Sequence, residues 1–438
     1  MFSKGFAQTI LSLAVVLYTA YWEGNMSFSQ LDMWLTHIRD QHKQPIDLGL
    51  ERVRQVAADL NLLNPLYAVI TVGGTNGKGS TVAGLEASFL AARRYRVGAF
   101  TSPYLYRFNE LVRMNGVEVG DEDFIQAFSR IERARGKVTL TQFEFNTLAA
   151  LDIFQRAGID IAILEVGLGG RLDAVNIIDA DVAVTTSIAL DHTALLGDTR
   201  ESIAREKAGI FRSDKPAVCG DFDPPMTLID YAREINAPLF CQGKQFGFEK
   251  TASAWNWWSE NTRLDDLPLP RLALQNMSTV LMVIELLQKI VPVRSSALHS
   301  ALRKAHLPGR IQVIPDEVTR ILDVSHNPAA AEFLAAYLRK NPPRGKIRAV
   351  FSMLADKDIP QTIHVIQDCI DEWHIAPLQI DRATPLPMLE KYFRESAIHA
   401  VYSYDSVKMA YHAAQAVATK GDCIVVFGSF HTVAACNI

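Results

Sequence analysis

The sequence predicts an α/β fold with two domains, the first of which contains a mostly parallel sheet. The chain has 438 residues, which is long for a single hydrophobic core. Strand and helix patterns alternate from residue 67 onward. The predicted strands are nearly continuous apolar runs, such as the one at 159–167. Such runs are typical of strands that helices cover on both faces.

The first domain is expected to begin with two helices and to continue as alternating strands and helices. Apolar periodicity predicts helices at 27–42, 46–63, 82–94, 121–136, 145–158, 274–290 and 295–305. Apolar runs predict strands at 67–72, 96–103, 159–167 and 180–192. Between 213 and 272 the pattern weakens, and the segments at 255–260 and 266–271 indicate irregular or antiparallel structure. We expect the tryptophans at 255, 257 and 258 to pack under a hairpin there.

A domain boundary is predicted near Pro308 and Gly309, because these residue types end helices. We therefore predict a first domain at 26–305, a linker at 306–310 and a second domain at 311–438. The second is a smaller, Rossmann-like α/β domain with strands predicted within 319–340, 347–358, 373–378 and 422–433. Because the chain stops soon after Val433, we expect this domain to lack a closing helix.

The first 25 residues leave two interpretations open. Lys4 precedes an apolar run at 6–22, as in a signal peptide or a membrane anchor. The run lacks a clear small-residue cleavage site and contains Gln8, Thr9 and Ser12. Instead of a signal peptide or an anchor, we favour the interpretation in which the functional chain begins at Met26 and 1–25 is an upstream extension.

Charge and cysteine content exclude several classes of protein. The 44 basic and 48 acidic residues nearly balance, and no basic tract indicates nucleic-acid binding. Five scattered cysteines, at 219, 241, 369, 423 and 436, form no CxxC pair. Free thiols in a reducing cytoplasm fit this pattern best. We expect a cytoplasmic monomer with no nucleic-acid or membrane partner.

The glycine-rich stretch GGTNGKGST at 73–81 separates a predicted strand from a predicted helix. This arrangement presents backbone N–H groups and a positive helix end to phosphate, and indicates a P-loop-type ATPase domain. Lys78 would add a charge near the terminal phosphates, and Ser80 or Thr81 a hydroxyl near a metal. Val72 and Gly79 depart from the standard phosphate loop, so an ordinary glycine-rich turn remains an alternative.

Polar residues follow several predicted strands and should gather where ligands bind in parallel sheets, at the carboxyl ends. They are Ser102, Glu165, Asp191 and His192. Glu165 lies in an apolar strand, so it must bind a cation or pair with a partner such as Arg171. Mg²⁺ beside phosphates uses one or two carboxylates and retains waters.

Five positions have both a functional and a structural interpretation. His192 alone would more often be structural, and Lys207 would by charge pattern lie on a solvated helix face. Glu144 is either a substrate contact or a carboxylate at a helix N-terminus. Asp323 and His326 in DVSHNP could hold a nucleotide, or the segment could be a helix cap through Ser325 and Asn327. Arg310 lies at the predicted hinge, where it could reach phosphate.

Nine motifs occur along the chain in one order. They are GTNGKGS at 74–80, TSPYLYRFNE at 101–110, EVGLGGRLDAVNI at 165–177, SIALDHT at 187–193, REKAGIF at 205–211, LPGR at 307–310, DVSHNPAA at 323–330, MLADKD at 353–358 and FGSFHTV at 427–433. Together they resemble the dihydrofolate synthase / folylpolyglutamate synthase family, a branch of the Mur ligase superfamily. The resemblance extends from about Leu31 to Val433.

This resemblance implies ATP-dependent amide ligation. ATP would phosphorylate a carboxylate of dihydropteroate or of a folate, and the amino group of L-glutamate would attack the acyl phosphate. ADP and phosphate would be released. The alternatives are a folylpolyglutamate synthase that does not act on dihydropteroate, a cell-wall Mur ligase, and a non-catalytic nucleotide-binding regulator.

The resemblance also assigns roles to particular residues. The ATP contacts that it implies are Thr75, Asn76, Gly77, Lys78, Gly79, Ser80, Asn276, Arg310, Asp323 and His326. Two Mg²⁺ sites are implied, the first with Ser102 and Glu165, and the second with Glu165, His192 and a carbamylated Lys207. The implied catalytic residues are Lys78, Glu165, His192 and Lys207. The pterin would lie against Asp47, Leu48, Gly49, Leu50, Thr141, Gln142, Phe143, Glu144, Leu172, Asp173 and Ala174.

Overall fold

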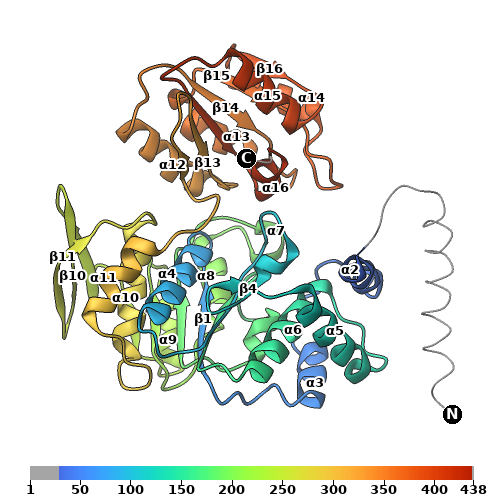
Figure 1. Cartoon of the computed structure of the whole chain (residues 1–438), viewed down its shortest axis with the longest axis vertical. Helices are drawn as coiled ribbons and strands as arrows, with labels where there is room; N and C mark the ends of the chain where they lie inside the picture. The colour runs from blue at the N-terminus through green and yellow to red at the C-terminus, as the bar shows by residue number, and fades with distance from the viewer. Residues whose placement is uncertain (1–28, 437–438) are drawn as a thin grey trace.

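An eight-stranded sheet forms the centre of the larger domain in the computed structural model, which describes residues 29–436 (Figure 1). Its strands are β1 (Ala68–Gly73), β2 (Val97–Phe100), β3 (Val112–Met114), β4 (Val117–Glu118), β5 (Ile161–Glu165), β6 (Val182–Thr185), β7 (Ala217–Cys219) and β8 (Leu239–Cys241). Their order is β4-β3-β2-β5-β1-β6-β7-β8; the strands from β2 to β8 in this order pair in parallel, whereas β3 pairs antiparallel with both β2 and β4. The predicted parallel sheet is confirmed.

Helices cover one face of this sheet. They are α2 (Gln30–Asp40), α3 (Glu51–Asp59), α5 (Asp121–Arg135), α6 (Gln142–Ala157), α8 (Arg200–Ala208) and α9 (Met226–Glu234). Three shorter elements lie in the connections: η1 (Phe108–Leu111), η2 (Ala174–Ile177) and α7 (Thr193–Leu196). Local signals set the ends of α6, because Thr141 and Glu144 form a capping box and Gly158 adopts the left-handed conformation. Phe128 of α5 and Phe145 of α6 are fully buried in the shared core.

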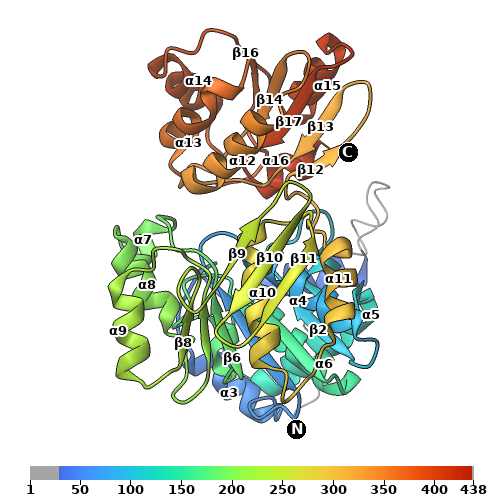
Figure 2. The ribbon, with the colours of Figure 1, turned by 90° about the vertical axis from the view of Figure 1, so that its left-hand side faces the viewer.

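The opposite face carries three helices and a small antiparallel sheet (Figure 2). These elements are α4 (Lys78–Ala91), α10 (Leu274–Leu286), α11 (Ser295–Lys304), β9 (Phe246–Lys250), β10 (Ala254–Ser259) and β11 (Arg263–Pro268). Trp255 and Trp257 of β10 are buried in the core below, and Trp257 Nε1 donates to the Ser278 carbonyl at 3.1 Å. The prediction that these tryptophans pack rather than bind a ligand fits this arrangement.

The smaller domain is built on a six-stranded sheet of order β12-β13-β17-β14-β15-β16. Its strands are β12 (Gln312–Ile314), β13 (Thr319–Leu322), β14 (Ile347–Phe351), β15 (Glu372–Ile375), β16 (Val401–Ser403) and β17 (Cys423–Phe427). Its helices are α12 (Pro328–Lys340), α13 (Ile359–Ile366), η3 (Gln367–Cys369), α14 (Leu386–Glu395), α15 (Val407–Val417) and α16 (Phe430–Ala435). Only β12 pairs in the antiparallel direction. The proposed linker at 306–310 lies in the interval between α11 and β12.

Three parts of the sequence analysis differ from the structure. The strand predicted at 180–192 ends at Thr185, so Asp191 and His192 lie in the following loop. The weak pattern at 213–241 contains β7, α9 and β8, whose three-residue strands are too short for a periodic signal, whereas the antiparallel structure expected farther along is present in β10 and β11. The strand predicted at 422–433 ends at Phe427, and α16 follows it, so the domain does close with a helix. Gly428, at a φ of 115°, makes this turn.

Within residues 29–436, no helix combines the length and apolar character needed to span a membrane. The apolar run at 6–22 and the proposed extension at 1–25 lie outside the described residues.

We predict that Trp257→Ala lowers the free energy of unfolding by about 3 to 5 kcal/mol, because it leaves a cavity under the antiparallel sheet. Denaturant unfolding followed by circular dichroism measures this loss. The matched control is Trp258→Ala on the same strand, where the side chain is only half-buried. Equal losses for the two variants would contradict the assignment of Trp257 to the core.

Candidate functional site

The glycine-rich loop joins β1 to α4 and has little freedom to change. Gly74 and Gly77 adopt φ values of 138° and 90°, which residues with a side chain rarely adopt. A Cβ on Gly74 would also lie 1.8 Å from Thr186 Oγ1. Lys78 begins α4, and its Nζ donates to the carbonyls of Gly74 at 3.1 Å and Thr75 at 3.2 Å. The loop therefore curves around the lysine at a helix N-terminus, as a phosphate-binding loop does.

The segment after β6 fastens this loop in place. Thr75 N donates to the Ser187 carbonyl at 2.6 Å, and Asn76 N donates to Ser187 Oγ at 3.1 Å. Thr186 Oγ1 donates in return to the Asn76 carbonyl at 2.7 Å. These bonds explain why the segment after β6 leaves the sheet so early.

The predicted nucleotide contacts close around the loop from three elements. Asn276 of α10 packs against Gly77, where a Cβ would lie 2.6 Å from Asn276 Oδ1. Gly79 and Ser80 are buried in the first turn of α4. A Cβ on Gly79 would lie 3.9 Å from Arg310 Nη2. The Arg310 guanidinium therefore reaches the glycine loop.

Glu165 ends β5 and is almost fully buried. Its Oε2 accepts the Ser102 backbone N–H at 3.2 Å. Burial raises the pKa of Glu165, although Lys78 and Arg310 act in the opposite direction. The alternative partner, Arg171, instead pairs with Glu206 at 2.8 Å, so the interpretation of Glu165 as half of an ion pair with Arg171 was wrong.

Lys207 lies on α8 and is 4% exposed, so the prediction of a solvated helix face was wrong. The close approach of the turn after β5 buries it, since a Cβ on Gly170 would lie 3.2 Å from Lys207 Cα. Burial and the charge of Lys78 lower the pKa of Lys207 to about 7. A large fraction of this amine is therefore neutral near neutral pH.

Asp191 receives three groups from the smaller domain. Its carboxylate pairs with Lys357 Nζ at 2.5 Å, accepts from Asn327 Nδ2 at 3.3 Å and lies 3.6 Å from His326 Nε2. Burial alone would raise the pKa of Asp191, but the contacts with His326 and Lys357 hold it well below its usual range. Lys357 was missed as a site residue, and its only sequence signal is the MLADKD motif.

His192 stands beside Asp191 in the left-handed conformation, at a φ of 52°. Its Nε2 lies 3.4 Å from Lys357 Nζ. Burial lowers the pKa of His192 to about 4, so the imidazole is neutral near neutral pH and can act as a ligand.

A reciprocal amide contact also joins the two domains. Asn76 Nδ2 donates to Asn327 Oδ1 at 3.1 Å, and Asn327 Nδ2 donates to Asn76 Oδ1 at 3.0 Å. Asn327 also caps α12, as predicted, because its side chain accepts from Ala330 N. One residue therefore serves both the helix and the interface.

Asp323 orders the hinge rather than standing free. It accepts Ile311 N at 2.7 Å and Ser325 N at 2.9 Å, and its carboxylate also accepts the Ser325 hydroxyl. The Arg310 guanidinium lies 4.9 Å above the ring of Phe430, which sequence reasoning did not identify. These contacts hold Arg310 toward the glycine loop.

The three predicted pterin segments belong to neighbouring elements, because η2, which begins at Ala174, packs against α3 and α6. Arg52 joins two of them, since it pairs with Asp47 at 2.8 Å and with Glu144 at 3.2 Å. Glu144 also belongs to the capping box of α6, which agrees with the helix N-terminal interpretation. Phe143 packs on Gly167, where a Cβ would lie 2.6 Å from the ring. Asp173 is buried and caps η2, and burial raises its pKa to about 7.

The donor set fits a divalent cation held largely by phosphate and water. Within residues 29–436, no three His, Cys, Asp or Glu side chains form a metal cluster. Glu165 and the neighbouring Ser102 would then supply few protein oxygens. Mg²⁺ beside a nucleotide is usually held by one or two carboxylates together with phosphate oxygens and waters.

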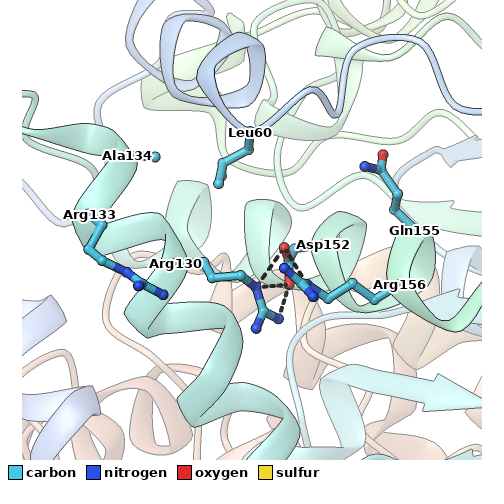
Figure 3. A pocket seen from close by; sticks show the side chains of 7 residues that line it. All are labelled: Leu60, Arg130, Arg133, Ala134, Asp152, Gln155 and Arg156. Atoms are coloured by element: carbon cyan, nitrogen blue, oxygen red, sulfur yellow. Dashed lines mark hydrogen bonds and ion pairs between the residues drawn. The ribbon is translucent and has the colours of Figure 1, made fainter.

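A cavity of about 630 Å³ lies elsewhere, between the helices α3, α5 and α6. It surrounds Asp152, toward which Arg130 and Arg156 both point (Figure 3). None of the predicted site residues lines it.

Comparison with known proteins agrees with this geometry. Residues 72–265 match the family model described as Mur ligase middle domain, and residues 309–430 match Mur ligase, glutamate ligase domain. A dihydrofolate synthase/folylpolyglutamate synthase of Escherichia coli is 45% identical, with 93% of this chain and 94% of that protein covered.

Solved structures with the same fold include two that hold ligands. E. coli FolC in complex with DHPP and ADP has a TM-score of 0.89 and 45% identity, covering 93% of this chain and 96% of that one. A bifunctional folylpolyglutamate synthase/dihydrofolate synthase with Mn, AMPPNP and L-glutamate bound has a TM-score of 0.87 and 44% identity, covering 93% and 97%. The chain belongs to the dihydrofolate synthase/folylpolyglutamate synthase family of Mur ligases.

Proposed function

We propose that this ATP-dependent ligase forms an amide between L-glutamate and two kinds of acceptor, dihydropteroate and folates. The observation that carries the proposal is the meeting of Lys78, Glu165 and Arg310 at the domain boundary. A nucleotide on the glycine loop would place its terminal phosphate among these groups. The complexes with DHPP, ADP, AMPPNP and L-glutamate in relatives support the substrate classes.

The chemistry requires activation of a carboxylate, which is a poor electrophile. Transfer of the terminal phosphoryl group gives an acyl phosphate, whose phosphate then leaves when the amine attacks. Lys78 and the loop N–H groups hold the phosphates, and Arg310 approaches from the other side. Fixed cations that face the developing charge lower the barrier without reorganising.

Two Mg²⁺ sites would share Glu165. We assign Ser102 and Glu165 to the first site, and Glu165, His192 and carbamylated Lys207 to the second. When bound, the cations would neutralise charge on the transferring phosphoryl group. The neutral imidazole of His192 and the neutral amine of Lys207 suit these roles, since a ligand must offer a lone pair and carbamylation requires a free amine.

Three segments would hold the pterin: Asp47–Leu50, Thr141–Glu144 and Leu172–Ala174. They would orient the acceptor so that its carboxylate faces Glu165 and the phosphates. We further propose that the enzyme works as a monomer in the cytoplasm, where five free thiols would stay reduced.

The proposed reaction is tested by release of ADP from purified protein. We expect release only when ATP, Mg²⁺, L-glutamate and a pterin acceptor are all present. Dihydropteroate and a reduced folate should each serve as acceptor. Activity with the folate alone would leave only folylpolyglutamate synthase activity, and nucleotide binding without turnover would favour the regulator.

Glu165→Gln should lower kcat by at least about 100-fold, because it removes the buried charge that would hold the cations but keeps an acceptor for Ser102 N. Steady-state kinetics measure the loss, and circular dichroism verifies the fold. The matched control is Glu206→Gln, which removes only the pair with Arg171. Similar losses in both variants would contradict a specific role for Glu165.

Carbamylation of Lys207 predicts that activity depends on carbon dioxide and rises with pH between about 6 and 8. The sign follows from the lowered pKa, about 7, because the neutral amine that reacts becomes the main form above it. Activity at a fixed CO₂ pressure and carbon-13 NMR after labelled CO₂ test this. Lys207→Arg should be inactive and show no CO₂ dependence; wild-type activity without a carbamate signal would refute the modification.

Asp191→Asn should favour separation of the two domains, because it removes the carboxylate that Lys357 contacts. We expect a larger radius of gyration in X-ray solution scattering and about tenfold weaker ATP binding. Asp198→Asn, at an exposed position between α7 and α8, is the control. Unchanged scattering in the Asp191 variant would show that other contacts hold the domains together.

A further inference from the structure

Two cysteines lie side by side at the edge of the large sheet, at the carboxyl ends of β7 and β8. Cys219 of β7 and Cys241 of β8 are directly paired in the register of the two parallel strands. In-register residues point to the same face from strands about 4.8 Å apart, which is within the Cα separation that a disulfide spans. Both thiols are free. The pair needs only an oxidant to become linked.

Both thiols are buried, but only Cys241 borders a cavity. Cys241 lines a cavity of about 460 Å³, together with Ile229, Arg233, Asn236, Lys244 and Gln245. Cys219 is fully buried and does not line this cavity. β8 is the edge strand of the sheet beside α9, so it is paired on one side only and can adjust (Figure 2).

The pKa values of the two thiols also differ, and the thiol that borders the cavity, Cys241, has the lower one. Hydrogen bonding from the Cys219 thiol, and then the charge of Lys244, lower the pKa of Cys241. The contact with Cys241 and burial raise the pKa of Cys219. Thiolate character and access together favour reaction at Cys241.

We propose that Cys241 and Cys219 form a reversible disulfide when the protein meets hydrogen peroxide. The Cys241 thiolate attacks one peroxide oxygen, the O–O bond breaks, and a sulfenic acid and hydroxide result; the hydroxide takes up the proton that the Cys241 thiol had lost and becomes water. Cys219 then attacks the sulfenic sulfur, the S–O bond breaks, and its thiol proton leaves with the hydroxyl as water. Both sulfurs are oxidised, and the peroxide is reduced to two waters in total.

A disulfide between these cysteines would affect the candidate site through β7. Directly after Cys219, the Gly220 N–H donates to the Thr185 carbonyl at 2.8 Å. Asp221 Oδ2 accepts the Ile188 N–H at 2.8 Å, in the loop that leads to His192. A Cβ on Gly220 would lie 2.5 Å from Thr279 Oγ1, so this end of β7 is packed without slack.

The test is mass spectrometry of the intact wild-type protein after hydrogen peroxide, alkylation and digestion. We expect a Cys219–Cys241 linked peptide pair that dithiothreitol reverses. Cys423 and Cys436 are also buried but are not paired with another cysteine in the sheets, so they should remain alkylatable after unfolding. Half-buried Cys369 reports that peroxide reached the protein.

Two variants test the order of the steps. In Cys219→Ser, dimedone should trap a sulfenic acid on Cys241, because the second thiol is missing. In Cys241→Ser, Cys219 should remain unlabelled. Wild-type protein that keeps both thiols reduced while Cys369 is oxidised would overturn the proposal, as would labelling of Cys219 in the second variant. The linked-peptide measurement on wild-type protein stands even if a variant fails to fold.

Discussion

The site depends on holding several charged groups, both positive and negative, away from bulk water. Burial lowers the pKa values of Lys78, Lys207 and Arg310. The free energy of their charged forms is therefore unfavourable until an anion arrives. The surrounding cores offset this cost, and a polyphosphate would relieve it. The arrangement explains why nucleotide binding and completion of the site would be coupled.

The rigidity of the cradle comes from close backbone approaches rather than from many side-chain contacts. Gly74 touches Thr186, and Gly77 touches Asn276, so the loop is held between β6 and α10. Each approach requires a glycine, and each also brings a polar side chain to the loop. The same residues that make the turn possible therefore define where phosphate can lie.

Much of the fold and of the candidate site could be predicted from the sequence, because the relevant signals are local. Continuous apolar runs indicated the parallel sheet, and the order of the motifs indicated the family. What could not be predicted depends on tertiary contacts. The burial of Lys207 follows from the approach of Gly170, and the role of Lys357 follows from its contact with Asp191 across 166 residues of chain. The strands β7 and β8 were missed because three residues carry no periodicity. The sequence predicted Asp191 and His192 at the end of a strand. In the structure β6 ends earlier, because the segment after it forms hydrogen bonds with the glycine loop, and composition does not reveal these bonds.

The contact between Asn76 and Asn327 has a consequence for how the two halves of the enzyme can part. Two amides that exchange hydrogen bonds carry no net charge, and each finds equivalent partners in water when they separate. Together with the ion pair at Asp191, these amides make part of the interface between the domains polar, so that water can hydrate it readily. Leu105, whose side chain packs into the core of the smaller domain, is an apolar exception. Repeated separation of the two domains would therefore expose little apolar surface, and the risk of aggregation would stay low.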